Sequence, residues 1–570
     1  MDKTNVRELQ DVVIRFSGDS GDGMQLTGTL FSDTSALLGN GISTFPDYPA
    51  EIRAPQGTVA GVSGFQVHFG SHRELNPGDY CDVLVAMNPA ALKANRKWLK
   101  PGATVIIDGD SITEDHLKKA CFATLDPIAE LKLDEYNVVI PGITTMTRDA
   151  LRETGLDNKS VTKCKNMFAL GICFYLFDRP EAYAFKYIET KFAKKNPAIA
   201  EANKLAIQAG YNYAANTHQF ANTYTVAPAP LEKGTYRSIS GNVATAWGLC
   251  AAAEKAGLPL FCGSYPITPA TVILEELAKR KDLGVKTVQA EDEIAGICTA
   301  IGAAFAGNFA VTTTSGPGLS LKSEALGLAV MTELPLVVVD VQRGGPSTGL
   351  PTKTEQSDLA QALYGRNGEC PVIVVAASSP SDCFHYAFEA GRLAMEHMTP
   401  VILLTDGFIA NGSEPWRIPA MKDYPAITPP IVDEAPEGGF MPYVRNENLA
   451  RGWAFPGKTG LEHRVGGLEK DCVKGCISHD PSNHQKMVRT RAEKVAKAVD
   501  DIPAQAVWGA PEGDLLVVGW GGTRGHLQNA VDQMRAEASA FRCAISTTST
   551  RCRTAYARYS RNSARSSSAS

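Results

Sequence analysis

Residues 258–269, LPLFCGSYPITP, form a short apolar run that ends in a polar turn containing two prolines. A second strand-like run follows and ends close to the carboxylate of Glu293. In open α/β sheets, ligands bind at the carboxyl ends of the strands, where such polar turns gather. The stretch therefore predicts an α/β domain in which the Thr268 hydroxyl and the Glu293 carboxylate lie on adjacent strand ends.

Apolar runs of the same kind recur along the chain. They are continuous rather than alternating, which is typical of parallel strands covered by helices on both faces. The first series lies at 11–16, 82–88, 103–108 and 137–142, and the second runs from LPLF at 258 through VKTVQA, AVTTT and LPLVVVDV to PVILLTDG, ending near 415. We predict an α/β, multidomain protein with doubly wound parallel sheets.

At 570 residues the chain is too long for one hydrophobic core. Composition and periodicity predict a first α/β domain, a polar linker, a second α/β domain, a proline-rich irregular segment with a basic helix near 485–499, the start of a third α/β domain, and a basic tail. The predicted boundaries are 1–195, 196–235, 236–415, 416–510, 511–541 and 542–570.

Bulk properties exclude several classes of protein. The net charge of −5 argues against nucleic acid as a partner, and there is no uninterrupted apolar stretch of membrane-spanning length. The polar N-terminus lacks a signal peptide, so we expect a cytoplasmic protein. The 13 cysteines contain no Cys-x-x-Cys pair and no tight group, so we expect reduced thiols, no metal site and no iron–sulfur cluster in this chain.

The glycine turn at 18–23, GDSGDG, follows the first strand and precedes a helix predicted over 24–38. Its backbone could bind a phosphate at the helix N-terminus. The turn could equally need Gly18, Gly21 and Gly23 only for its shape, because the spacing is not that of a dinucleotide-binding fingerprint. Its GDG triplet imitates a thiamine diphosphate metal motif, but Asn40 comes too soon to complete it.

Three polar segments follow strands of the second domain. Glu293 is followed by the small residues Gly302, Ala303 and Ala306, although an acid there also suits a simple helix start. The TTTSGPG segment at 312–318 supplies hydroxyls and a tight turn. The segment at 343–352, RGGPSTGLPT, places a guanidinium, which can bind a carboxylate with two hydrogen bonds, before hydroxyl residues.

The combination of YPITP, QAEDEIAG, TTTSGPG and VQRGGPSTGLPTKTEQSDL resembles the alpha subunit of 2-oxoacid:ferredoxin oxidoreductases. Residues 1–195, with FPDYPAEIRAPQGTVAG and MNPAALKAN, resemble the gamma domain of that family, and residues 236–415 resemble its pyrimidine-binding domain. The region from 511 is similar to the start of a transketolase C-terminal-like domain. A gamma-then-alpha fusion is similar to the 2-oxoglutarate branch, the 2-oxoglutarate synthases.

The resemblance implies a thiamine diphosphate-dependent oxidation of 2-oxoglutarate with CoA to succinyl-CoA and CO₂, with ferredoxin as electron acceptor. It also implies a beta partner that holds the diphosphate, Mg²⁺ and a 4Fe-4S cluster, in an assembly of two alpha and two beta chains. By resemblance, Glu293 activates the pyrimidine, Thr268 contacts the substrate and Arg343 binds its carboxylate. Further contacts are implied for cofactor at Tyr265, Pro266, Ile267, Thr314, Ser315 and Gly316, for substrate at Ser347 and Thr348, and for CoA at Gly18, Gly21 and Gly23.

Three alternatives stay open at this point. A pyruvate or branched-chain 2-oxoacid enzyme would have the same motifs without a second substrate carboxylate to recognise. A non-catalytic binding subunit would have kept the fold, although Thr268, Glu293 and Arg343 would then be unexplained. A dehydrogenase that binds a dinucleotide in its first domain lacks the fingerprint expected for it.

The tail at 542–570 contains six arginines and eight serines but no lysine or acidic residue. One reading is a disordered basic tail. The other is a shifted reading frame, because synonymous codons read one frame over permit a run such as L-N-P-L-P that family members carry there.

Sequencing the gene across codon 542 distinguishes these two readings. We expect a frame-disrupting insertion or deletion near this codon, upstream of a segment that encodes a further strand and helix in another frame. An unbroken in-frame sequence in independent isolates would contradict the frameshift hypothesis.

Overall fold

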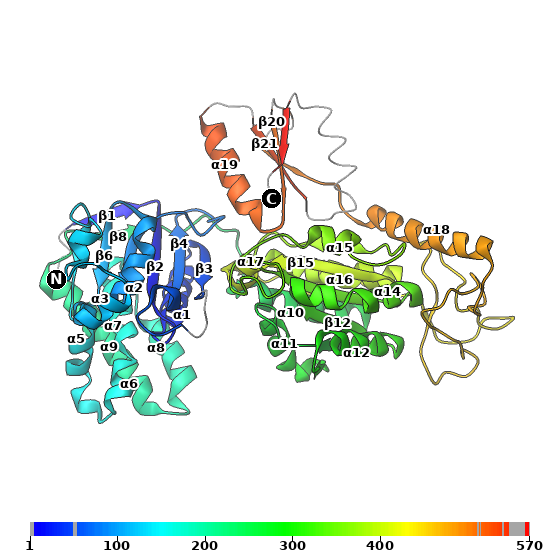
Figure 1. Cartoon of the computed structure of the whole chain (residues 1–570), viewed down its shortest axis with the longest axis horizontal. Coiled ribbons are helices and arrows are strands. Elements are labelled where there is room, and N and C mark those ends of the chain that lie inside the picture. The colour runs from blue at the N-terminus through cyan, green and yellow to red at the C-terminus, as the bar shows by residue number, and fades with distance from the viewer. Residues whose placement is uncertain are drawn as a thin grey trace. The chain divides into compact units, whose positions relative to one another are not determined.

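The computed structural model describes residues 5–49, 54–509, 512 and 515–537, and the backbone of 541–546 and 565–568. The chain divides into two compact units (Figure 1). Unit 1 contains residues up to Ser238 together with Gly412–Arg417, and unit 2 contains Ile239–Asn411 and the chain from Ile418 onward. Each unit is described separately below.

Unit 1 alternates strands and helices. Its main elements, in chain order, are β1 (Val6–Leu9), β2 (Asp11–Asp19), α1 (Met24–Leu37), β3 (Gly41–Asp47), β4 (Val62–Gly70), β5 (Cys81–Ala86), α2 (Pro89–Asn95), β6 (Leu99–Ile107), α3 (Glu114–Lys119), α4 (Pro127–Glu130), β7 (Asn137–Val139), α5 (Ile143–Ala150), α6 (Asn158–Thr162), α7 (Lys165–Leu176), α8 (Ala182–Ile188), α9 (Pro197–Thr217), β8 (Thr223–Val226), β9 (Tyr236–Ser240) and the returning strand β16 (Ser413–Arg417).

The unit 1 sheet has the order β3-β4-β2-β5-β6-β7 and is covered on both faces. Alternate residues of β2 enter different cores: Ile14 and Phe16 pack in the cluster that contains α1, α7 and α9, whereas Val13 packs in the cluster that contains α2. The four strands predicted from apolar runs are confirmed as β2, β5, β6 and β7. Doubly covered strands explain why those runs were continuous.

Two of the five strand pairings in this sheet are antiparallel, which the sequence did not predict. β4 pairs antiparallel with both β2 and β3, whereas β2, β5, β6 and β7 pair in parallel. The segments 41–47 and 62–70 escaped sequence reasoning because glycine, serine and proline interrupt their apolar residues.

The linker predicted over 196–235 is wrong in its first half, because α9 occupies Pro197–Thr217. Asn196 caps this helix by accepting a hydrogen bond from the Ile199 amide. Glycines allow α9 and α7 to pack closely: a Cβ at Gly210 would lie 1.9 Å from the Phe168 carbonyl oxygen, and one at Gly171 would lie 2.0 Å from that of Ile207. Alanine and asparagine had suggested a linker, but the alanines face a buried helix interface.

Unit 2 is built around a second α/β sheet. The elements of this sheet and its covering helices are α10 (Gly241–Ala256), β10 (Leu260–Ser264), α11 (Thr271–Ala278), β11 (Lys286–Gln289), α12 (Glu293–Phe305), β12 (Phe309–Thr314), α13 (Gly316–Leu321), α14 (Ser323–Thr332), β13 (Leu336–Gln342), α15 (Leu359–Tyr364), β14 (Ile373–Ala376), α16 (Asp382–His397), β15 (Pro400–Asp406) and α17 (Gly407–Asn411).

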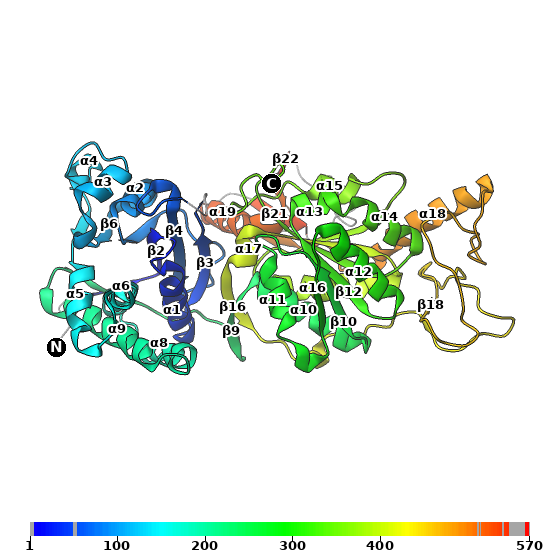
Figure 2. The same ribbon diagram turned by 60° about the horizontal axis from the view of Figure 1, so that its bottom comes forward.

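The unit 2 sheet is entirely parallel, with the order β11-β10-β12-β13-β15-β14, as predicted for this domain. Leu336 and Val338 of β13 pack on the face covered by α12 and α14. Figure 2 shows α10 and α11 to one side of β10 and β12, and α12 to the other. From β10 the chain first moves outward to β11 and then returns past β10 to β12, which creates a topological switch point between β10 and β12.

Residues 418–506 contain few regular elements, as predicted: β17 (Ile431–Val432), β18 (Trp453–Ala454) and α18 (Pro481–Lys497), which confirms the basic helix. Buried charges order this segment. Glu333, at the end of α14, is 1% exposed and pairs with Arg445 at 2.6 Å and Lys494 at 2.5 Å. Burial alone would raise the pKa of Glu333, but the Lys494 and Arg445 charges hold it well below its usual range.

The last part of the chain forms a four-stranded sheet of order β19-β21-β20-β22. β20 and α19 lie where the sequence predicts the start of a third α/β domain. The bounds are β19 (Val507–Gly509), β20 (Leu515–Trp520), α19 (Arg524–Ala536), β21 (Phe541–Ser546) and β22 (Arg565–Ser568). The strands β21 and β22 were not expected. The prediction that the alternation of strands and helices ends at residue 541 is therefore wrong for these two segments. The rest of the tail lies outside the described residues.

Replacing Glu333 with alanine tests the buried charge cluster. The substitution leaves Arg445 and Lys494 as unpaired buried cations, a change that costs on the order of 3–5 kcal/mol in the free energy of unfolding. Urea denaturation measures this loss. Glu437→Ala, at an exposed position, is the matched control and should change stability by less than about 0.5 kcal/mol.

Comparing the wild-type chain with the Glu333→Ala variant at low pH gives a second test of the cluster. Because the folded pKa of Glu333 is lowered, its contribution to stability is present above the ordinary carboxyl pKa and is lost as the pH falls through the folded value. The wild-type chain should therefore lose more stability on acidification than the Glu333→Ala variant. Equal losses would contradict the assignment.

Candidate active site

Four polar segments meet at the carboxyl ends of the unit 2 strands. They follow β10, β11, β12 and β13, and strand pairing places these ends along one edge of the sheet. The ends of β10 and β12 are joined further by Ser264, whose Oγ donates to the Thr313 carbonyl oxygen at 2.7 Å. The two segments predicted from YPITP and TTTSGPG therefore border the switch point, where α/β sheets bind ligands.

Glu293 is the first residue of α12 and is 8% exposed. Asp292 caps the helix, with its Oδ1 accepting from the Ala295 amide at 2.7 Å. Of the two acids, Asp292 therefore has the structural role of a helix cap, which leaves Glu293 free for another role. Among the described residues, none donates a hydrogen bond to the Glu293 carboxylate. The residue is buried, but its carboxylate oxygens are not among the enclosed atoms without a partner, so a ligand that brings a donor can reach them.

Gly318 brings Glu293 and Thr314 together. A Cβ at this position would lie 2.0 Å from Thr314 Oγ1 and 2.8 Å from Glu293 Cγ, so no larger residue fits without displacing them. Thr314 and Ser315 are fully buried, and Ser315 Oγ has no hydrogen-bond partner in the described part of the chain. The structure thus brings together Glu293, Thr314, Ser315 and Gly316, which the sequence had predicted as neighbours.

Lys322 is a site residue that sequence reasoning missed. Its side chain is fully buried, and Nζ donates to the main-chain carbonyl oxygen of Glu293 at 2.7 Å. Burial lowers the pKa of Lys322 to about 8, against the opposing effect of the Glu293 charge. Nothing in the local sequence signals this contact, because Lys322 stands between α13 and α14 and resembles a surface residue.

Arg343 joins the segments that follow β10 and β13. One guanidinium nitrogen donates to the Thr268 carbonyl oxygen at 2.8 Å and the other to the Thr348 carbonyl oxygen at 3.3 Å. Arg343 is 7% exposed, and its Nε has no acceptor among the described residues. Burial lowers the pKa of Arg343, while the Glu293 charge opposes that shift. The Arg343 guanidinium thus holds the two segments together and still has one N–H, that of Nε, without an acceptor among the described residues.

The remaining predicted residues lie at the open side of these segments. Tyr265 is 37% exposed, and Thr268, Ser347 and Thr348 are also exposed. Pro266 and Ile267 are half-buried. Side chains on both sides of Arg343 are therefore accessible to a ligand or another chain.

Both acids of the unit 1 glycine turn, Asp19 and Asp22, already have partners within unit 1. Asp22 accepts from the Asp19 amide at 2.9 Å and pairs with Lys165 at 2.9 Å, and Asp19 accepts from the Gly57 amide. Of the three glycines, Gly23 alone has a positive φ, 75°. The turn interpretation thus accounts for Gly23, and the CoA contacts of Gly18, Gly21 and Gly23 stay a prediction.

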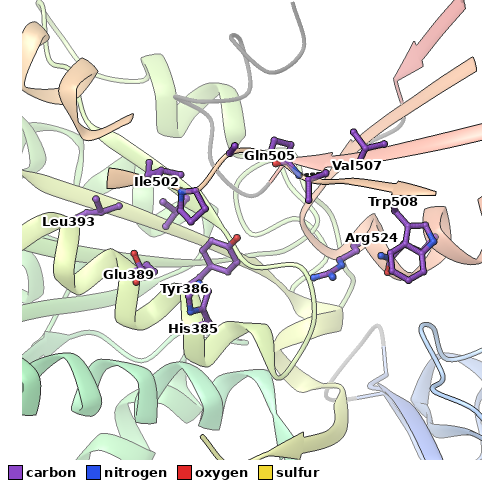
Figure 3. Close-up of a pocket in the computed structure, with 14 residues that line it drawn as sticks. His385, Tyr386, Glu389, Leu393, Ile502, Gln505, Val507, Trp508 and Arg524 are labelled. Atoms are coloured by element: carbon purple, nitrogen blue, oxygen red, sulfur yellow. Dashed lines mark hydrogen bonds between the residues drawn. The ribbon is translucent and has the colours of Figure 1, made fainter. Parts of the chain in front are cut away.

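A separate pocket of about 290 Å³ lies between α16 and the segment 502–508, and Figure 3 shows residues that line it. Its lining includes His385, Tyr386 and Glu389 of α16 and Arg524 of α19, and it contains none of the predicted site residues. Arg524 donates to Ser378 Oγ at 3.0 Å.

The described residues contain neither a helix that could span a membrane nor a cluster of metal-binding side chains. No helix there has both the length and the apolar character needed to cross a membrane. No group of three or more histidine, cysteine, aspartate or glutamate side chains in the same residues is placed to hold a metal ion.

Comparison with known proteins identifies the family. Residues 252–477 match the thiamine diphosphate-binding family model of pyruvate flavodoxin/ferredoxin oxidoreductases, and residues 13–213 match the pyruvate ferredoxin/flavodoxin oxidoreductase model. The chain is 53% identical over 531 residues to the 2-oxoglutarate oxidoreductase subunit KorA of Mycobacterium tuberculosis, covering 93% of this chain and 80% of the relative. The chain belongs to the 2-oxoacid:ferredoxin oxidoreductases.

Two further relatives agree with this assignment to the family. The 2-oxoglutarate synthase subunit KorA of Methanothermobacter marburgensis is 37% identical over 308 residues, covering 52% of this chain and 78% of the relative. A solved 2-oxoglutarate:ferredoxin oxidoreductase from Magnetococcus marinus, with 2-oxoglutarate, coenzyme A and succinyl-CoA bound, has a TM-score of 0.84 at 31% identity, covering 98% of this chain and 92% of that chain.

Replacing Gly318 with alanine tests how tightly the site is packed. The new methyl group would overlap Thr314 Oγ1 and Glu293 Cγ, so we expect a loss of about 1–3 kcal/mol in the free energy of unfolding. Chemical denaturation measures the change.

Gly327→Ala is the matched control, because a Cβ at this position in α14 meets nothing within 4 Å. Alanine in a helix interior should there stabilise the chain by up to about 1 kcal/mol. A Gly318→Ala variant as stable as the Gly327→Ala variant would contradict the packing described.

Proposed function

We propose that this chain is the alpha subunit of an enzyme that oxidises 2-oxoglutarate with CoA to succinyl-CoA and CO₂, passing the two electrons one at a time to ferredoxin. The observation that carries the proposal is the buried Glu293 carboxylate, which has no donor among the described residues and lies beside the switch point of the sheet. The names of the Mycobacterium tuberculosis and Magnetococcus marinus relatives support 2-oxoglutarate as the substrate.

The donor set fits the pyrimidine half of thiamine diphosphate. Glu293 would accept a hydrogen bond from the protonated ring nitrogen, and Ser315 Oγ, which has no partner in the described part of the chain, offers a second polar contact. Gly316, Thr314 and the 265–267 segment would form the surrounding wall. When bound, the cofactor supplies the carbanion that adds to the 2-oxo group. Glu293 supplies the carboxylate that the ring requires for its activation.

Arg343 and Thr268 would hold the substrate. The Arg343 Nε lacks an acceptor and its guanidinium is already fixed by two carbonyl oxygens, so a substrate carboxylate would meet a preorganised cation. Exposed hydroxyls are carried by Thr268, whose carbonyl oxygen accepts from Arg343, and by Ser347 and Thr348, which follow Arg343 in the same loop. A second carboxylate, present in 2-oxoglutarate and absent from pyruvate, needs a second donor, which the partner chain could supply.

The other half of the site would belong to a beta partner. Large apolar side chains that border the strand ends are exposed, a pattern typical of interaction surfaces: Tyr265, Val288, Ile294, Leu321 and Leu350. We place Mg²⁺ and a 4Fe-4S cluster on that partner, in an assembly of two alpha and two beta chains that reduces ferredoxin in the cytoplasm. CoA would approach the glycine turn of the gamma domain.

Co-expression with the adjacent beta-like gene tests the proposal. The purified complex should reduce viologen in a CoA-dependent reaction with 2-oxoglutarate and react at least tenfold more slowly with pyruvate or a branched 2-oxoacid. Faster turnover with pyruvate or with the branched 2-oxoacid would show that this acid, and not 2-oxoglutarate, is the substrate. No activity with any of them, despite bound thiamine diphosphate, would overturn the catalytic assignment.

Replacing Glu293 with glutamine tests the role of its carboxylate. Because the amide is neutral, we expect exchange of the cofactor C2 proton, followed by NMR, to slow by about 10²–10⁴-fold. Glu291→Gln, at an exposed position two residues earlier, is the control and should exchange at the wild-type rate. Wild-type exchange in the Glu293→Gln complex would move the role to another residue.

A further inference from the structure

Two buried carboxyl groups lie beneath the loop that carries Arg343. Asp340 belongs to β13 and has no exposed surface, and Asp358 precedes α15 and is 9% exposed. The Asp358 amide donates to the side chain of Gln342, which stands two residues after Asp340 on the same strand, so the two carboxyl groups lie close together, and each acts on the protonation of the other. Two buried carboxyl groups at close range cannot both ionise without a large cost in free energy.

Within the described residues, three of the four carboxylate oxygens of the two acids lack a donor. Both carboxylate oxygens of Asp340, and Oδ2 of Asp358, receive no hydrogen bond from an N–H or a hydroxyl in the part of the chain that the structure describes. Asp358 occupies the N-cap position of α15, where aspartate normally caps the helix, yet its side chain makes no capping hydrogen bond. Instead, it turns toward Asp340.

The position of the pair couples it to the site. Asp358 ends the loop that begins at Arg343, and its amide donates to the Gln342 Oε1 at 3.1 Å. It also packs against the TTTSGPG segment, since a Cβ at Gly316 would lie 2.7 Å from Asp358 Oδ2. The pair is thus a side-chain attachment between the sheet and the end of the loop that carries Arg343, Ser347 and Thr348.

We propose that Asp340 and Asp358 share one proton and that this carboxyl–carboxylate hydrogen bond is a latch that holds the loop 343–358 over the strand ends. Asp358 is then a positioning residue, acting on the 2-oxoacid through Arg343, and that part of the inference rests on the proposed function. When the proton leaves, two buried carboxylates repel one another and the loop loosens.

The pH dependence has a defined sign. Burial raises the pKa of Asp340 well above its usual range, and the Asp358 charge adds to the shift. Burial also raises the pKa of Asp358, and the exposed Glu355 is the further acid that acts on it. Because the folded chain holds a proton that the unfolded chain releases near pH 4, stability falls as the pH rises from there to the folded pKa.

The test uses three variants of the alpha–beta complex. Asp340→Asn places an amide donor against Asp358 and needs no proton, so it should keep the latch closed at every pH. Asp340→Leu removes the hydrogen bond. Asp423→Asn alters an exposed aspartate and is the matched control.

The first measurement is the KM for 2-oxoglutarate between pH 6 and 9.5. In the wild type and in Asp423→Asn, KM should rise by up to about tenfold per pH unit above the pKa of the pair, as loss of one proton requires. The rise should be absent in Asp340→Asn, with kcat changing less than KM. An Asp340→Asn variant with the wild-type profile would overturn the proposal.

The second measurement does not depend on activity. Hydrogen exchange of peptides from 343–358, corrected for the intrinsic effect of pH, should accelerate with pH in the wild type, stay constant in Asp340→Asn and be fast throughout in Asp340→Leu. A complex that is inactive but shows this pattern would refute the proposed function and keep the latch. Exchange in the wild type that does not change with pH would refute the latch, whether or not Asp340→Leu folds.

Discussion

Parallel pairing of β10, β12 and β13 is the constraint on which the site depends. Parallel strands end at the same edge of a sheet, so the polar segments that follow them meet there whatever their separation in sequence. The chain reverses its direction across the sheet between β10 and β12. Such a reversal marks the place where α/β sheets bind ligands, and Glu293 and the segments around it border it.

The charge of a buried carboxylate is compensated in three different ways among the acids of unit 2. Glu333 is fully compensated by Arg445 and Lys494 and orders the segment that follows the sheet. Asp340 and Asp358 compensate one another through a shared proton. Glu293 receives no donor from the described residues, and its main-chain carbonyl is fixed by Lys322. This difference separates a structural acid from one that is suited to a ligand.

The sequence predicted the parallel sheet of unit 2, because continuous apolar runs and strand-end turns have a direct physical cause. It also predicted Glu293, Thr314 and Arg343 as neighbours through their motifs. It missed the antiparallel strands β3 and β4, whose glycines and serines hide their periodicity, and α9, whose alanines resemble a linker. Lys322 and the Asp340–Asp358 pair depend on contacts distant in sequence, which no local pattern encodes.

The central claim is that this chain forms one wall of a thiamine diphosphate site and a partner chain forms the other. Equilibrium dialysis of thiamine diphosphate with Mg²⁺ tests it most directly, using the alpha chain alone, the beta chain alone and the complex. The account predicts that the complex binds at least about tenfold more tightly than either chain. Equal affinity of the alpha chain alone and the complex would contradict it.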